Sequence, residues 1–325
     1  KAIRRQRQMC IRDSHRKLHP TGGHALEPAL QAGDVIAAHR RKSNCGMLLH
    51  IGRTSLWFAC LCEQLDNLRE PLGQVPAALV GEEQGAPVLL ANRTRSKAEA
   101  VARELGAQTA DNETVARECS LIFLGVKPQM MEQMLSGLVP ILKARKDRFV
   151  LASMAAGLDA RRIQEMAGGA YPVICLMPNT PVAVGAGVVQ YYGVDATEEE
   201  LSDFQNLLSA AGMIDRVDPE RLNAASAVSG CGPAFCAMFI EALADGGVAC
   251  GLPRDKALAY AAKMAEGTAR LMLENHAHPG QLKDGVCSPG GTTIQGVRTL
   301  EDRGFRSAVI EAVIAAYEKT IALGK

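Results

Sequence analysis

Short apolar runs alternate with helical patterns through the middle of the chain. From about Gly85 onward, four runs of four to six largely apolar residues are each bounded by polar or turn-forming residues. Runs this short and this apolar are typical of strands buried on both faces of a parallel sheet. We expect strands at residues 88–91, 121–126, 149–153 and 173–177, with a helix at 96–105. The alternation predicts an α/β fold with a Rossmann-like, doubly wound parallel sheet.

The pattern changes beyond Thr197, where long helical segments follow with almost no strand signal. Glycines recur within these helices although each costs about 1 kcal/mol relative to alanine, which indicates close contacts between helices. We therefore expect a dinucleotide-binding domain at residues 71–196 and an all-helical domain at residues 197–325.

Residues 1–70 do not follow either pattern. They hold 12 Lys and Arg but 6 Asp and Glu, and their apolar residues keep neither the helical nor the strand period. Early acids such as Asp13 and Glu27 disfavour a targeting peptide, and no folded reader accompanies them to support a nucleic-acid-binding arm. The third interpretation, which we favour, is a foreign or mistranslated segment, for instance from a frameshift. The segment is expected to be atypical, and either disordered or mistranslated.

The residues after the strand at 88–91 suit an NADP-binding site. The carboxyl end of this strand is where a Rossmann sheet binds the adenosine ribose. An NAD-binding site usually places an acid there, whereas a 2′-phosphate needs cations and hydroxyls. The chain offers Asn92, Arg93, Thr94 and Arg95, with no acid before Glu99. The alternative is a solvated basic turn in which Thr94 or Ser96 caps the following helix.

The glycine-rich loop that should precede this strand is not recognisable. A G-x-G-x-x-G loop lets the backbone approach the pyrophosphate. Gly46, Gly52, Gly73 and Gly81 are isolated, and none has the required spacing after an apolar strand. Residues 73–80 are the nearest remnant and resemble the start of the first helix. We expect the first strand and the glycine loop to be abnormal, with the same cause as the atypical segment.

Composition excludes several classes of partner. The net charge of +1 gives no general attraction to nucleic acid or to anionic membranes. No apolar run reaches about 18 residues, so we expect no transmembrane helix. The ten cysteines are scattered without a convincing metal-ligand spacing. We expect a reduced, cytoplasmic protein without a bound metal.

Three motifs in the second half of the chain are distinctive. They are M-P-N-T-P at residues 177–181, S-G-C-G-P-A-F at 229–235 and S-P-G-G-T-T at 288–293. The prolines of the first fix an extended turn at the end of a strand. The last leads into an apolar helix, so unpaired backbone N–H groups at the helix N-terminus can bind a carboxylate. Standing alone, it also fits a simple capped helix start.

Together these motifs resemble the pyrroline-5-carboxylate reductase family over about residues 86–325. M-P-N-T-P matches the family without change, and Cys231 and Phe235 replace the Ser and Tyr of S-G-S-G-P-A-Y. Residues 121–129 resemble the family's strand ending in A-V-K-P-Q, and residues 154–157 match a turn written S-x-A-A-G. The resemblance implies an enzyme that transfers a hydride from NADPH, or from NADH, to the imine of 1-pyrroline-5-carboxylate and so forms proline, the last step of proline biosynthesis.

The resemblance also implies site residues and an assembly. Together with the turn after the strand at 88–91, the expected cofactor-binding residues are Asn92, Arg93, Thr94, Asn112, Gly125, Val126, Lys127, Pro128, Met154, Ala156 and Asn179. The substrate carboxylate is expected at Ser288, Gly290, Gly291 and Thr292, and the hydroxyl of Thr293, the expected catalytic residue, would bond the ring nitrogen. A Glu and an Asn near this loop in some relatives fall at His276 and Gly285 here. The helical domain would interlock two subunits in a homodimer or higher homo-oligomer.

Two alternatives stay open. A β-hydroxyacid dehydrogenase would share the architecture but needs a catalytic lysine in a helix, which we do not find. An inactive family member would keep the fold and the dimer interface without binding a dinucleotide, as the unrecognisable G-x-G-x-x-G favours.

Overall fold

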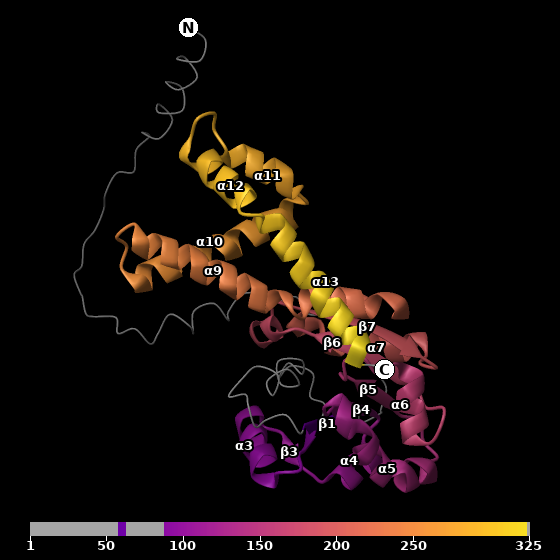
Figure 1. Ribbon diagram of the computed structural model, residues 1–325. Coiled ribbons are helices and arrows are strands. Elements are labelled where there is room, and N and C mark those ends of the chain that lie inside the picture. The colour runs from indigo at the N-terminus through magenta and orange to yellow at the C-terminus, as the bar shows by residue number, and fades with distance from the viewer. Residues whose placement is uncertain (1–57, 63–87, 324–325) are drawn as a thin grey trace, which may run out of the picture. The chain divides into compact units, whose positions relative to one another are not determined.

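The computed structural model describes residues 58–62 and 88–323, and an eight-stranded sheet forms its first part (Figure 1). The strand order is β3-β2-β1-β4-β5-β6-β7-β8. The strands are β1 Phe58–Cys62, β2 Val88–Ala91, β3 Gln108–Thr109, β4 Leu121–Gly125, β5 Val150–Ser153, β6 Val173–Pro178, β7 Gly187–Val194 and β8 Gly212–Arg216. Neighbouring strands from β3 to β6 in this order are all parallel. Strand β7 runs antiparallel to β6, and β8 is parallel to β7.

Helices connect the strands and then make up the rest of the described chain. Those of the sheet part are α3 Arg95–Leu105, α4 Asn112–Glu118, α5 Pro128–Ala144, α6 Ala160–Ala167 and α7 Glu198–Leu207, with short 3-10 turns η1 Thr180–Val184 and η2 Ser209–Ala211. After a third turn, η3 Pro219–Arg221, come α8 Leu222–Ser229, α9 Gly232–Ala249, α10 Arg254–Asn275, α11 Pro279–Val286, α12 Thr292–Asp302 and α13 Phe305–Leu323.

The four predicted strands are confirmed as β2, β4, β5 and β6, and the Rossmann-like parallel sheet with them. The prediction that the first strand is abnormal needs correction, because β1 pairs with both β2 and β4, the place of the first strand in a Rossmann sheet. Its five-residue run was hidden in a segment without periodicity. The sequence pattern also did not predict β7 and β8. Residues 1–57 and the expected helix start at 73–80 lie outside the described residues.

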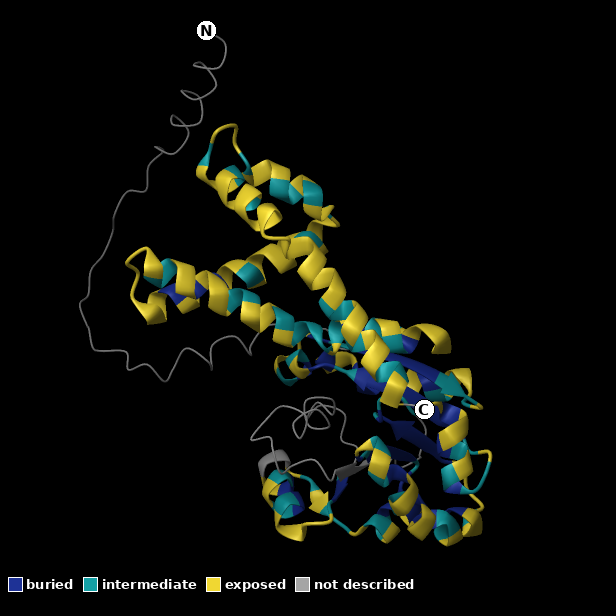
Figure 2. Ribbon diagram, in the orientation of Figure 1, coloured by how far each residue is buried: buried dark blue, intermediate teal, exposed yellow. Residues whose placement is uncertain are grey.

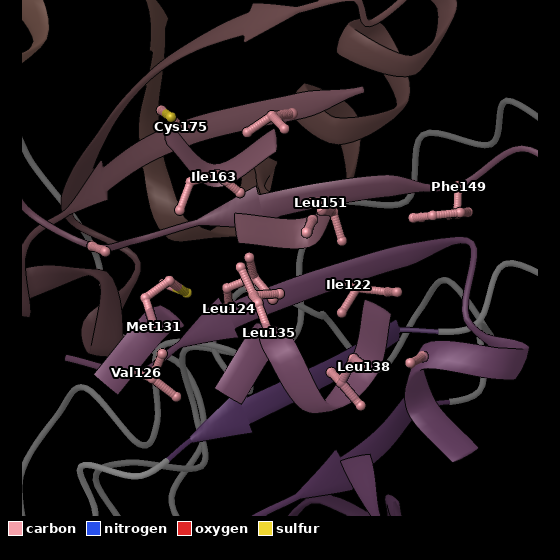
Figure 3. Packing of buried hydrophobic residues seen from close by; sticks show 14 of the residues in the cluster. Ile122, Leu124, Val126, Met131, Leu135, Leu138, Phe149, Leu151, Ile163 and Cys175 are labelled. Atoms are coloured by element: carbon pink, nitrogen blue, oxygen red, sulfur yellow. The ribbon is translucent and has the colours of Figure 1, made fainter. Parts of the chain in front are cut away.

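Alternate residues of the central strands fill two cores on opposite faces of the sheet. On one face, Ile122 and Leu124 of β4 join Leu151 and the buried side chains of α5 and α6, such as Leu135 and Ile163 (Figure 3). On the other face, Leu121 and Phe123 join a cluster of residues from β6, β7 and α7. Both faces are therefore apolar, which explains why the strands are apolar at every position.

A buried arginine anchors the segment that connects α5 to β5. The side chain of Arg145 is 4% exposed. Its Nη1 donates to the carbonyl oxygens of Ala116 and Cys119, at 2.9 and 2.7 Å, where α4 ends. Its guanidinium lies 4.3 Å from the ring centre of Phe149 and pairs with Asp147, whose pKa this hydrogen bond lowers. Arg145 thus satisfies carbonyls that α4 leaves without a partner.

The helices from α8 onward expose most of their surface (Figure 2). Ala244, Ala257 and Ala261 are buried where α9 packs against α10. Large apolar side chains are exposed instead, among them Met238, Tyr260, Leu273 and Ile310. By length and composition alone, the stretch Pro219–Ala249 would suffice to cross a membrane, although no apolar run predicted this. An exposed apolar surface of this extent is typical of an interaction site.

Candidate active site

The expected cofactor-binding residues lie at the carboxyl ends of neighbouring strands. The strand order places the end of β2, followed by residues 92–94, near the end of β4, where residues 125–128 lead into α5. Residues 154–156 follow β5, and Asn179 follows β6. Asn112 begins α4, after β3. All eleven residues thus belong to one edge of the sheet, which is the edge where Rossmann folds bind dinucleotides.

The turn after β2 is open to an anion. Asn92 Oδ1 accepts a hydrogen bond from the Thr94 N–H at 2.7 Å, and Thr94 precedes α3 without capping it through its side chain. Arg93 and Thr94 are exposed, and Arg93 forms no ion pair within the described residues. Arg95 is engaged with Glu99 at 3.0 Å. The side-chain capping by Thr94 or Ser96 that we considered as an alternative is absent at this helix start, so the cation and hydroxyl face solvent.

An unsatisfied polar atom marks the same turn. The Asn92 Nδ2 is buried and has no hydrogen-bond partner among the described residues. The first turn of α3 contains no acid, so the positive end of the helix dipole is uncompensated there. These features fit the binding of a phosphate-bearing cofactor.

At β4 and β5, small residues and backbone face the edge. Val126 is 3% exposed and belongs to the core, so only its backbone is available to a ligand. Lys127 is exposed and precedes α5, in which Pro128 occupies the first turn. After β5, Ala155 is buried, whereas Met154 and Ala156 are partly exposed. A flat ring can approach such a turn closely.

The side-chain amide of Asn179 is hydrogen-bonded within the protein. Its Oδ1 accepts from the Val188 N–H at 2.8 Å, and its Nδ2 donates to the Ser229 carbonyl at 3.1 Å. The amide is therefore engaged within the protein, and the side chain is 8% exposed. Gln190, which the sequence did not single out, donates to Ser229 Oγ at 2.7 Å. In the sequence, Gln190 is distinguished as a polar residue within an otherwise apolar run.

The S-P-G-G-T-T segment is a tight turn followed by the start of α12. Gly290 has a φ of +69°, which suits glycine, and the Gly291 N–H donates to the Ser288 carbonyl at 3.0 Å. A Cβ on Gly291 would lie 2.3 Å from Ser288 Oγ. The Gly291 N–H that we expected to hold the carboxylate is thus already used.

The backbone N–H groups without an acceptor in this segment begin at Thr292, one residue after Gly291. Helix α12 begins at Thr292 with no side-chain cap, so the N–H groups of Thr292, Thr293 and Ile294 have no acceptor among the described residues. Ile294 was not predicted. The side chains of Ser288, Thr292 and Thr293 are exposed. Three N–H groups at the positive end of a helix suit an anion without the help of a charged side chain.

Two neighbouring positions carry no acid or amide. His276 ends α10 in the left-handed region, with a φ of +48°, and Gly285 lies in α11. Within the described chain, no group of three His, Cys, Asp or Glu residues could hold a metal ion.

Two family models match the chain. The model described as pyrroline-5-carboxylate reductase dimerisation matches residues 219–323. The model described as NADP oxidoreductase, coenzyme F420-dependent, matches residues 72–157. The second match takes in residues 73–80, which we interpreted as the start of the first helix.

Pyrroline-5-carboxylate reductases are similar in sequence and in structure. The enzyme of Escherichia coli K12 is 39% identical over 70% of this chain and 85% of its own length, and that of Corynebacterium melassecola is 35% identical over 78% and 96%. The crystal structure of the Plasmodium falciparum pyrroline carboxylate reductase with NADP bound is 26% identical, covers 84% of this chain and 100% of its own, and superposes with a TM-score of 0.73. The chain belongs to the pyrroline-5-carboxylate reductase family.

Proposed function

We propose that this chain reduces 1-pyrroline-5-carboxylate to proline with NAD(P)H, the last step of proline biosynthesis. The proposal rests on three N–H groups at the start of α12 that have no acceptor among the described residues, in a chain that also has the dinucleotide edge of a Rossmann sheet. Oxidation of NADPH by the purified full chain, followed by nicotinamide absorbance, tests it. Folded protein that binds NADPH but leaves it unoxidised in the presence of the imine would contradict the activity.

The residues of the chain bind and orient while the cofactor carries the redox chemistry. When bound, NAD(P)H would supply the hydride for the carbon of an imine that is already protonated on nitrogen, so the product amine keeps that proton. The N–H groups of Thr292, Thr293 and Ile294 hold the carboxylate, and Ser288 and Gly290 shape the turn that aims them. The Thr293 hydroxyl accepts a hydrogen bond from the protonated ring nitrogen and fixes which face of the imine meets the hydride.

Replacing Thr293 with alanine is expected to lower kcat/KM. The corresponding loss of transition-state stabilisation should be about 1–3 kcal/mol, the size of a lost hydrogen bond to a polarised group. The backbone N–H remains, so the carboxylate should still bind. Steady-state kinetics of the purified variant measure the change. Thr293→Ser keeps the hydroxyl and should retain most of the activity, whereas equal losses in both variants would contradict the assignment.

We further propose that NADP is preferred over NAD. The exposed Arg93 and Thr94 support this, together with the absence of an acid in the first turn of α3. The 2′-phosphate would accept from both side chains and from the start of the helix. The backbone of residues 125–128 and the side chains of Met154 and Ala156 would line the rest of the cofactor, with Asn112 on the adenosine side. Asn179 would hold the turn after β6 in place through its hydrogen bonds to Val188 and Ser229.

Replacing Arg93 with alanine should lower kcat/KM with NADPH by about tenfold, since a charge-assisted hydrogen bond contributes roughly 1.5 kcal/mol or more. Activity with NADH should stay unchanged, because NADH has no 2′-phosphate. Arg95→Ala is the matched control, since Arg95 lies in the same turn but pairs with Glu99. Equal effects of Arg93→Ala on both cofactors would rule out the proposed contact.

The assembly is proposed to be a homodimer. The exposed apolar side chains of α9, α10 and α13 fall within the region that the dimerisation model matches. Pairing of these helices would bury them and explains a stretch apolar enough for a membrane without requiring one. Sedimentation of the full chain as a single species with the mass of one chain would contradict the proposal.

A family member without cofactor binding is the second candidate, because no G-x-G-x-x-G is recognisable in the sequence. Titration of folded protein with NADPH, followed by nicotinamide fluorescence, separates this candidate from an active reductase.

We also propose that the division between the two domains lies near Pro219 instead of residue 197, since α7 packs on the sheet and β8 is one of its strands.

A reducing compartment such as the cytoplasm is proposed, because the six cysteines of the described side chains are all free. Two of these thiols are protected as well: burial raises the pKa of Cys119 to about 12 and that of Cys175 to about 11. Cell fractionation tests the location.

A further inference from the structure

A buried polar cluster lies where β6 and β7 meet the end of α8. Asn179 and Gln190 are 8% and 5% exposed, and both direct their amides at Ser229, the last residue of α8. Asn179 reaches the Ser229 carbonyl, and Gln190 reaches its hydroxyl. The hydroxyl has two acceptors within reach, Gln190 Oε1 at 3.0 Å and the Ala225 carbonyl at 3.1 Å, and its single proton goes to one of them at a time. Burial of polar groups costs free energy unless every group is paired, and in this cluster each amide has a partner.

The cluster joins the proposed cofactor edge to the first long helix of the dimerisation region. Asn179 follows β6 directly and is bonded to both the N–H and the carbonyl of Val188 in β7. The Ser229 carbonyl belongs to the last turn of α8, which leaves such groups without helical partners. Helix α9 begins three residues later, at Gly232. The same three side chains therefore fix the end of β6 and the exit from α8.

We propose that Gln190 and Ser229 are positioning residues for hydride transfer, which act through Asn179 and touch neither substrate nor cofactor. They fix the M-P-N-T-P turn, and with it the proposed nicotinamide edge, relative to the helices that carry the substrate turn. The inference rests on the proposed placement of the nicotinamide beside β5 and β6. Hydride transfer is sensitive to such placement, because a displacement of about 1 Å can cost about 10²-fold in rate.

A positioning role of this cluster can be tested apart from a stabilising one. Replacing both partners of a buried hydrogen bond by apolar groups of similar shape can be nearly neutral for stability, whereas removing one partner strands the other. The double variant Gln190→Met with Ser229→Ala removes both partners of the pair at once. It therefore separates a positioning role from a stabilising one.

The test compares this double variant and Ser229→Ala with Ser229→Thr, which keeps the hydroxyl, in the full chain. Ser202→Ala in α7 and Gln133→Met in α5 make the same chemical changes at exposed positions and are the controls. Thermal unfolding, NADPH affinity, steady-state kinetics and the isotope effect from NADPH deuterated at the transferred position are measured for each protein.

We expect the double variant to keep its folding and its NADPH affinity and to lose about tenfold to hundredfold in kcat. Its isotope effect on kcat should rise, because hydride transfer becomes the slow step. Ser229→Thr should retain most of the activity, and both controls should match the original protein. If the double variant does not fold, the test compares Ser229→Ala with Ser229→Thr by the same measurements.

An unchanged kcat and isotope effect in folded double variant would overturn the inference. So would a loss confined to NADPH affinity, which would place the cluster in the cofactor site. If the original folded protein binds no NADPH, the proposed cofactor placement fails first, and this result is distinguishable because it appears before any substitution is made.

Discussion

Replacing Arg145 with methionine is expected to lower the free energy of unfolding by about 3–5 kcal/mol, because two charge-assisted hydrogen bonds to buried carbonyls are lost together. The acceptors belong to Ala116 and Cys119, both of which are 0% exposed, so water cannot replace the guanidinium without opening the fold. Methionine preserves much of the apolar stem that packs near Phe149. The loss should therefore reflect the stranded carbonyls more than a cavity.

Denaturant unfolding followed by circular dichroism measures this loss. Arg148→Met is the matched control: Arg148 lies three residues later and pairs with Glu200 at 2.6 Å, but its side chain is 54% exposed. Because Arg148 is half exposed, its contacts are expected to contribute less than those of Arg145, about 1 kcal/mol, although Glu200 is only 20% exposed and Arg148 also donates to the Asp195 carbonyl at 2.9 Å. Equal destabilisation by the two substitutions would show that the α4 carbonyls are not what Arg145 stabilises.

Replacing Thr292 with proline is expected to lower kcat/KM for the imine by about 1.5–3 kcal/mol, or roughly 10- to 150-fold, while leaving the fold intact. Thr292 is the first residue of α12, where proline is tolerated because its missing N–H has no helical acceptor. The preceding Gly291 has φ −76° and ψ 172°, the extended conformation that a residue before proline prefers. The substitution thus removes one donor to the carboxylate with little strain.

Thr292→Val keeps the N–H and removes only the hydroxyl, so it should retain most of the activity. Substrate kinetics and NADPH affinity are compared for the two variants, and NADPH affinity should be the same in both. Wild-type kinetics in a folded Thr292→Pro protein would exclude this N–H from the carboxylate site.

The strands that could be predicted are those buried on both faces. β4 is apolar at every position because Ile122 and Leu124 face one core and Phe123 the other. β8 was missed because it is an edge strand: Met213 is 60% exposed, and the polar residues beside it interrupt the apolar run. β1 was missed because its run stands in a segment without other periodicity.

The candidate site was predicted to the level of segments but not of individual donors. The order of parallel strands brings residues after β2, β4, β5 and β6 to one edge, so their sequence positions sufficed to group them. Which hydrogen bonds they make depends on the folded turn. The N–H of Gly291 is closed by Ser288, and the amide of Asn179 is engaged by Val188 and Ser229. Neither bond follows from residue type.

The start of α12 recognises an acid with groups that do not titrate. Backbone N–H groups keep their protons throughout the range in which a lysine or histidine would change charge. Affinity for the carboxylate should therefore stay level from mildly acidic to mildly alkaline solution, and turnover should fall as rising pH removes the proton from the imine nitrogen. Selection acting on this turn would preserve a backbone path, with glycines at two positions, ahead of any particular side-chain charge.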